Sequence, residues 1–125
     1  MRRITARRDI CWVGSALDDL RAFPDEVKGE IGRSLMEVQH GNDPPQSKVM
    51  QGFGGASVRE IVSDFDGDTY RAVYTVRFGS RIYALHAFQK KSHRGSKTDP
   101  ADVNLIKQRL RRAEEMHREW EESQQ

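Results

Sequence analysis

Residues 70–91 read YRAVYTVRFGSRIYALHAFQKK, and this stretch decides the fold. Apolar and polar side chains alternate on both sides of Gly79-Ser80, which is typical of two antiparallel strands joined by a tight turn. A two-residue turn would pair Tyr74 with Leu85 and continue the same register toward the strand ends. The sequence therefore predicts a hairpin that leads directly into two consecutive lysines.

The two faces of this hairpin differ, because side chains along a strand point alternately to opposite sides. One face is almost wholly apolar and carries Tyr74, Val76 and Leu85. The opposite face mixes cationic and apolar side chains, and both Arg71 and His86 lie on it. We expect the apolar face to pack on a core and the mixed face to be partly exposed.

The composition is that of one soluble globular domain spanning residues 1–125. Of the 125 residues, 36% are hydrophobic and 32% are charged. No apolar run approaches the roughly 18 residues of a membrane span, and the first ten residues lack the apolar core of a signal peptide. Cys11 is the only cysteine, which excludes an intramolecular disulfide. We expect a cytoplasmic protein without a cofactor or a bound metal ion.

Charge is strongly segregated along the chain, although the formal net charge is only +2. Residues 71–112 contain eleven Lys and Arg side chains against two Asp and Glu side chains. Such a basic block typically binds phosphate, an acidic protein surface or the acidic stretches of its own chain. The position of the block over the hairpin favours nucleic acid as the partner.

The remaining segments predict a scaffold of helices and strands around the hairpin. The expected elements are a strand at residues 10–13, a short helix capped by Ser15, a helix from Pro24 to Gly41, strands at residues 56–65 and on both sides of residues 79–80, and a final helix capped by Thr98 or Asp99. The class is α+β, with an N-terminal strand and a helical pair packed on a curved antiparallel sheet, followed by a C-terminal helix.

This order of elements resembles the RelE/ParE toxin superfamily, in its phage-derived HigB-like branch, whose members form a RelE-like small domain. Three motifs carry the resemblance, YRAVY at residues 70–74, IYALHAFQKKS at residues 82–92, and TDP at residues 98–100 before a basic amphipathic helix. They cover the C-terminal half of the chain, while the N-terminal half agrees in the order of its elements.

The resemblance implies a toxin of a type II toxin–antitoxin system. Such a toxin is an mRNA endoribonuclease (an mRNA interferase) that inhibits translation, typically on the ribosome, and a small helix-turn-helix antitoxin, here HigA-like, neutralises it. RNA can be cut without a metal ion when its own 2′-hydroxyl attacks the adjacent phosphate. Cations must then stabilise the developing charge, and another group must move protons.

The resemblance matches Arg71 to a family arginine that contacts the scissile phosphate and Lys91 to a second cationic position of ribosome-dependent relatives, and Lys90 is retained beside them as a catalytic candidate. A strand that runs straight places Lys90 on the Arg71 face and Lys91 on the other, whereas a bulge would exchange them. His86 could carry protons, since imidazole titrates near neutral pH, although its mid-strand position also suits a structural role. Further RNA contacts are expected from Lys48, Arg59, Arg77, His93, Arg94 and Lys97.

Two departures from the family pattern keep other functions open. Val62 stands where the HigB-like branch usually has a cation, and no tyrosine follows the paired lysines. Arg59 could compensate for Val62 only if the turn at residues 66–68 shifts the register by one residue. The alternatives are a non-enzymatic, ParE-like toxin that inhibits a protein target such as gyrase, and a nucleic-acid-binding module without activity.

Overall fold

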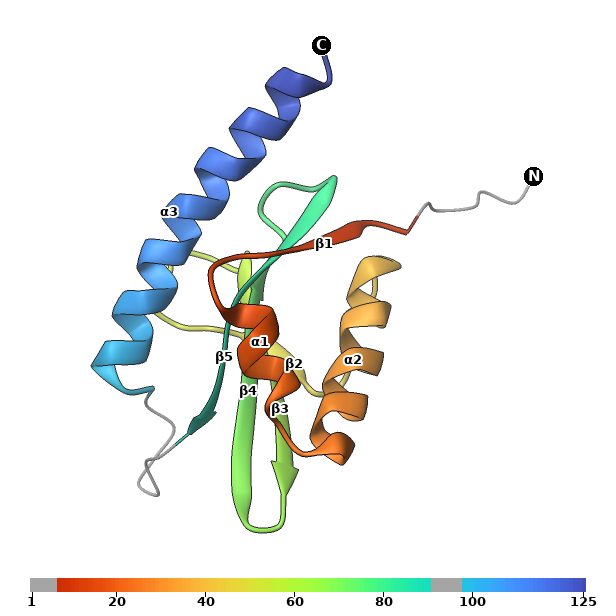
Figure 1. Ribbon diagram of the computed structural model, residues 1–125, viewed down its shortest axis with the longest axis vertical. Helices are drawn as coiled ribbons and strands as arrows, with labels where there is room; N and C mark the ends of the chain where they lie inside the picture. The colour runs from red at the N-terminus through yellow and green to blue at the C-terminus, as the bar shows by residue number, and fades with distance from the viewer. Residues whose placement is uncertain (1–6, 91–97) are drawn as a thin grey trace, which may run out of the picture.

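The computed structural model describes residues 7–90 and 98–125 and has the α+β fold expected from the sequence, with an N-terminal strand, two helices, further strands and a C-terminal helix (Figure 1). The elements are β1 (Asp9–Trp12), α1 (Ala16–Arg21), α2 (Asp25–Gln39), β2 (Ser47–Val49), β3 (Val58–Phe65), β4 (Asp68–Thr75), β5 (Arg81–Lys90) and α3 (Pro100–Ser123). Among the described residues, no helix is both long enough and apolar enough to cross a membrane.

The five strands form one mixed sheet in the order β1-β5-β4-β3-β2. Strand β1 lies parallel to β5, whereas the other neighbours are antiparallel. The expected antiparallel meander of β3, β4 and β5 is confirmed, and β1 joins it as a parallel edge strand, which the expected antiparallel sheet did not include. Strand β2 was not expected either, because three residues that follow Pro44-Pro45 are too short to show an alternating pattern.

Both faces of the sheet are covered by helices. On one face, Leu20 of α1 and Ile31 of α2 pack with Tyr74 and other sheet residues in a first core. On the other face, Ile106 of α3 packs with Val73 and other sheet residues in a second core, and Figure 1 shows α3 on the opposite side of the sheet from α1 and α2. The hairpin face that carries Arg71 is thus buried rather than partly exposed, because the apolar stripe of α3 lies over it.

The expected hairpin register holds only for the half of the hairpin that is distant from the turn. Arg71 pairs with Phe88 as expected, but a bulge after Val73 places Tyr74 opposite Ala84 instead of Leu85. Residues 76–80 form a longer connection than the predicted two-residue turn, and the backbone N–H of Gly79 donates to the Val76 carbonyl. The extra residue in β5 explains the shift, since a bulge sets two residues against one.

The turn between β3 and β4 fixes which side chains reach the Arg71 face. Phe65 pairs with Asp68, and the two residues between them, Asp66 and Gly67, have positive φ angles of 51° and 83°. Positive φ at both central residues is the pattern of a type I′ turn, which matches the twist of the strands it joins. This turn sets Val62 opposite Arg71, so no register shift occurs.

Candidate functional site

A cleft of about 510 Å³ lies between the β2 edge of the sheet and the start of α3. Its volume is within the range of about 300–1,000 Å³ that small-ligand sites occupy. The cleft is lined by Lys48, Val49, Met50, Gln51, Glu60, Arg71, Thr98 and Val103. It therefore combines side chains that are separated by more than fifty positions in the sequence.

An ion pair between Arg71 and Glu60 forms the charged floor of this cleft. The guanidinium Nη1 of Arg71 donates to Glu60 Oε1. The β3–β4 register places Val62 opposite Arg71 and Glu60 two residues away, so the pair is diagonal on the face toward α3. The side chains of Arg71 and Glu60 are only 7% and 5% exposed, and burial lowers the pKa of Arg71.

Two lysines add positive charge around this pair. Lys48 lies opposite Glu60 in the β2–β3 register, and its Nζ atom is 4.0 Å from Glu60 Oε1. The pKa of Lys90 is lowered by desolvation and then by the positive charges of Arg71 and Lys48, while Asp99 acts in the opposite direction. Lys48 and Arg71 line the cleft together with Glu60, so its described lining has an excess of one positive charge, and Lys90 lies close enough for both cations to lower its pKa.

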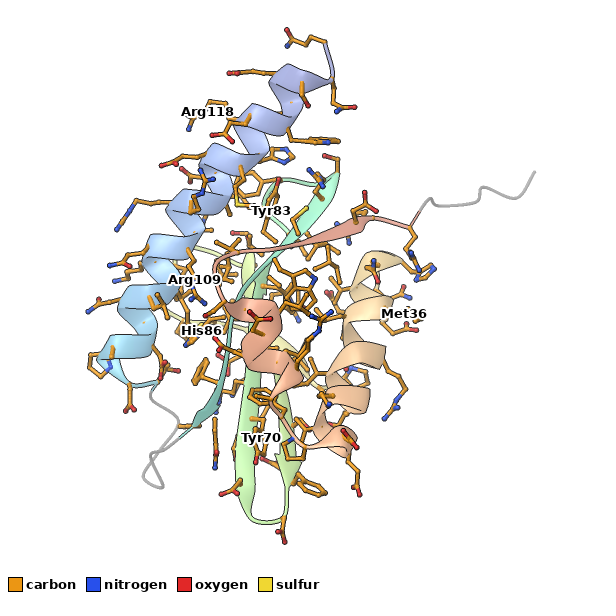
Figure 2. All side chains as sticks on the ribbon, in the orientation of Figure 1. Met36, Tyr70, Tyr83, His86, Arg109 and Arg118 are labelled. Atoms are coloured by element: carbon orange, nitrogen blue, oxygen red, sulfur yellow. The ribbon has the colours of Figure 1, made fainter. Side chains whose placement is uncertain are left out.

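His86 lies on the same side of the sheet but makes different contacts. Its Nε2 atom is 2.8 Å from Asp102 Oδ1, and its Nδ1 atom is 3.4 Å from Arg109 Nη1. The ring also stacks on Phe88, and Figure 2 shows His86 and Arg109 close together between β5 and α3. Because both ring nitrogens face protein groups, the geometry suits a structural histidine that links β5 to α3.

Arg59 and Arg77, both expected to contact RNA, lie away from the cleft. Arg59 pairs with Tyr74 in the β3–β4 register, on the face toward α2, and Arg59 Nη2 donates to Ser47 Oγ at 3.0 Å. Arg77 is in the connection before β5, where its Nη1 atom is 3.4 Å from Glu114 Oε1. The remaining expected side chains, Lys91, His93, Arg94 and Lys97, lie outside the described residues.

The structure thus brings together Arg71, Lys90 and Lys48 among the expected residues, and adds Glu60, which the sequence reasoning did not include as a site residue. The signal for Glu60 was present, since it follows the alternation of β3 and lies two positions before Val62. The pairing of Glu60 with Arg71 depends on the type I′ turn.

This arrangement can bind a phosphate and accept a proton at the same place. Cationic side chains stabilise the charge of a phosphate, and a carboxylate within reach can act as a base. In the described ranges, residues 7–90 and 98–125, no group of three or more His, Cys, Asp and Glu side chains is positioned to hold a metal ion.

A comparison with protein families identifies the chain. The family described as "Phage derived protein Gp49-like (DUF891)" matches residues 18–111, which is more than half of the chain. The chain belongs to the Gp49-like family. The match includes every described side chain that lines the cleft of this Gp49-like protein. No curated protein matches the chain significantly.

Proposed function

We propose that this Gp49-like protein is a toxin of a type II toxin–antitoxin system that cuts mRNA without a metal ion, on the ribosome, in the cytoplasm. The observation that supports this proposal is that Arg71 and Lys48 line one cleft beside the carboxylate of Glu60, with Lys90 close enough for both cations to lower its pKa.

In the proposed reaction, the 2′-hydroxyl of one nucleotide attacks the adjacent phosphorus. Glu60 removes the hydroxyl proton, while Arg71 and Lys48 stabilise the negative charge that develops on the phosphate oxygens. The bond from phosphorus to the 5′-oxygen breaks, and Lys90 donates a proton to that oxygen. The products are a 2′,3′-cyclic phosphate and a free 5′-hydroxyl.

The lowered pKa of Lys90 is consistent with this role. An ammonium group with an ordinary pKa is a weak acid at neutral pH, and proton transfer becomes more effective as its pKa approaches the working pH. Burial, Arg71 and Lys48 all lower the pKa of Lys90.

The decisive experiment is induction of the protein in cells, with primer-extension mapping of a translated message. Codon-related cuts are expected for the wild type, and a loss of about 100-fold or more for Glu60→Gln and Lys90→Ala. Lys107→Ala is the matched control, because Lys107 is an exposed cation of α3 that does not line the cleft. Growth arrest without any cuts would overturn the proposal.

A pH profile tests the role of Lys90 as the acid. Activity should fall as the pH rises through the pKa of Lys90, because the ammonium form donates the proton. Removing the positive charge of Lys48 raises the pKa of Lys90. In Lys48→Ala, the fall in cleavage rate at alkaline pH should therefore occur at a higher pH than in the wild type. The rate of cleavage, measured from pH 6 to pH 11, checks this, and a fall at the same pH in both proteins would contradict the role of Lys90.

One observation favours a different function. Glu60 neutralises Arg71, and Val62 occupies the neighbouring position opposite Arg71. A toxin that inhibits a protein target such as gyrase would not need a free arginine at this place. The same induction experiment separates the two functions, because inhibition of gyrase predicts intact mRNA and damaged DNA.

The proposed toxin would be neutralised by a small helix-turn-helix antitoxin. Such a partner would present acidic or apolar surface to the basic block, and it would act by covering the cleft or by blocking access to the ribosome. Co-expression with the product of an adjacent gene should restore growth, and the two proteins should elute together. Growth that stays arrested with every neighbouring gene would contradict this partner.

A further inference from the structure

The cations make up only part of the cleft lining. Met50 and Val103 contribute apolar surface, and Gln51 and Thr98 contribute an amide and a hydroxyl. The reaction proposed above uses none of these four side chains. Gln51 follows Lys48 by three positions, so it is at most roughly 10 Å from Lys48 along the chain. An apolar wall and neutral polar groups therefore lie near the phosphate-binding cations.

Gln51 and Thr98 are available to a ligand. Within the described residues, neither side chain makes a hydrogen bond. The amide of Gln51 is exposed, whereas Met50 beside it is only 4% exposed. A glutamine amide offers two N–H donors and one carbonyl acceptor, and a threonine hydroxyl can donate or accept.

The backbone holds Gln51 at the edge of the cleft. The N–H of Met50 donates to the Val58 carbonyl at 2.9 Å, which ties the segment before Gln51 to β3. Gly52 follows with a φ of 94°, a conformation that favours glycine. The Gly52-Phe53-Gly54-Gly55 segment thus begins a loop directly after Gln51.

We propose that this part of the cleft is a subsite for one nucleobase of the RNA, and that Gln51 determines which base it accepts. The base would lie against Met50 and Val103, and its hydrogen-bonding edge would face the Gln51 amide. The hydroxyl of Thr98 would contact a second polar atom of the base. Bases of single-stranded RNA are recognised in this way, by apolar contacts on their faces and hydrogen bonds on their edges. The inference rests on the proposed ribonuclease function, since it uses the same phosphate site.

Binding of single nucleotides tests the subsite without requiring cleavage. The purified full-length protein is titrated with AMP, CMP, GMP, UMP and inorganic phosphate, followed by NMR. For the wild type, the four affinities should span about tenfold, since a good amide-to-base contact discriminates by about this factor. Gln51→Ala should reduce the span to less than twofold, while phosphate binding stays unchanged. Lys90→Ala should weaken all four nucleotides equally.

Cleavage maps provide the second measurement. Gln51→Glu has the same shape but offers only acceptors, so cuts should move toward bases that present an amino or imino donor. Gln108→Ala is the matched control, since Gln108 is an exposed glutamine on α3 outside the cleft.

The outcomes separate this inference from the proposed function. Base-dependent binding that Gln51→Ala abolishes would support the subsite even if the wild type cuts no RNA, in which case only the ribonuclease function fails. The subsite would be overturned if the wild type bound all four nucleotides with equal affinity. It would also be overturned if Gln51→Ala left the range of the four affinities unchanged. RNA cutting whose base profile is the same for the wild type, Gln51→Ala and Gln51→Glu would also overturn it, while the ribonuclease function would stand.

Discussion

Arg71 and Glu60 show how strongly a single buried charge depends on its partner. Each carboxylate or guanidinium that leaves water needs a compensating charge, and these two side chains, both almost fully buried, supply it to each other. The pair therefore holds neighbouring strands together and shapes the cleft floor. Any variant of one partner acts on stability as well as on the proposed chemistry.

Arg71→Ala is expected to destabilise the protein by about 3–5 kcal/mol, because it leaves Glu60 buried without a partner. Replacing both members, as in Glu60→Met/Arg71→Met, should recover at least half of this loss, since no uncompensated charge remains. Urea denaturation monitored by circular dichroism measures both changes in the free energy of unfolding. A double variant as unstable as Arg71→Ala would show that the ion pair is not the cause.

Tyr74 gives a prediction for alkaline pH. Its hydroxyl is buried near the side chains of Ser47 and Arg59 but makes no hydrogen bond of good geometry within the described residues. Burial has the largest effect and raises the pKa of Tyr74 above the ordinary value of about 10, although Ser47 and Arg59 act in the opposite direction. Below that pH the tyrosine is neutral in the folded and unfolded chains. Above it the unfolded chain loses its proton first, so stability falls as the pH rises.

Tyr74→Phe should therefore be neutral or slightly stabilising at pH 7, and should lose less stability than the wild type between pH 10 and pH 11. Tyr83→Phe is the comparison, because the Tyr83 hydroxyl is 3.0 Å from His117 Nδ1 and its loss should cost about 1 kcal/mol at pH 7. Urea denaturation at both pH values is the measurement. If Tyr74→Phe and the wild type lose the same free energy of unfolding between pH 10 and pH 11, the ionisation of Tyr74 is not the cause of the loss.

At the scale of elements, the β3–β4 turn decides which strand face meets α3. A shift of one residue would turn Glu60 toward α2 and bring Arg59 to the cleft, because alternate side chains point to opposite faces. The two positive φ angles of Asp66 and Gly67 prevent that shift. The chemistry of the cleft thus depends on a turn that does not line it.

Two glycine substitutions should have opposite effects on the free energy of unfolding. Gly67→Ala should cost about 1–2 kcal/mol, because Gly67 has a φ of 83° and an L side chain is strained there. Gly32→Ala should stabilise by about 0.5–1 kcal/mol, because Gly32 lies inside α2 and a Cβ there would meet nothing within 4 Å. Thermal unfolding of both variants measures whether Gly67→Ala lowers and Gly32→Ala raises the stability. A loss of stability in both variants would contradict the prediction for Gly32.

Across the whole molecule, one sheet separates two cores, each closed by its own helices. Ile31 of α2 lies in one core and Ile106 of α3 in the other, and both side chains are fully buried. Since the same strands contribute to both cores, we expect the domain to unfold in one cooperative step.

Ile31→Val and Ile106→Val should each cost about 0.5–1.5 kcal/mol, and the double variant should cost their sum within about 0.5 kcal/mol. The fluorescence of Trp12, which packs against the α2 side, and of Trp120 on α3 should change at the same urea concentration. Single-tryptophan variants, Trp12→Phe and Trp120→Phe, separate the two signals. Different midpoints would show that the two cores unfold independently.

The helices and their buried faces were predictable because their signals are local. The apolar spacing of Val27, Ile31 and Leu35 indicated α2 and its core face, and Asp99-Pro100 marked the start of α3. The bulge in β5 was not predictable, since a bulge depends on how two strands and α3 pack together. It shifted the hairpin register near the turn by one residue.

The sequence by itself determined the elements other than β2, the α+β class and the basic hairpin, because helical and strand periodicities are properties of consecutive residues. Only the tertiary structure decided that β1 lies parallel to β5 and that α3 covers the Arg71 face. It also decided which charges meet. Glu60 and Arg71 are eleven positions apart, and a turn, a register and a helix together bring them into one buried pair.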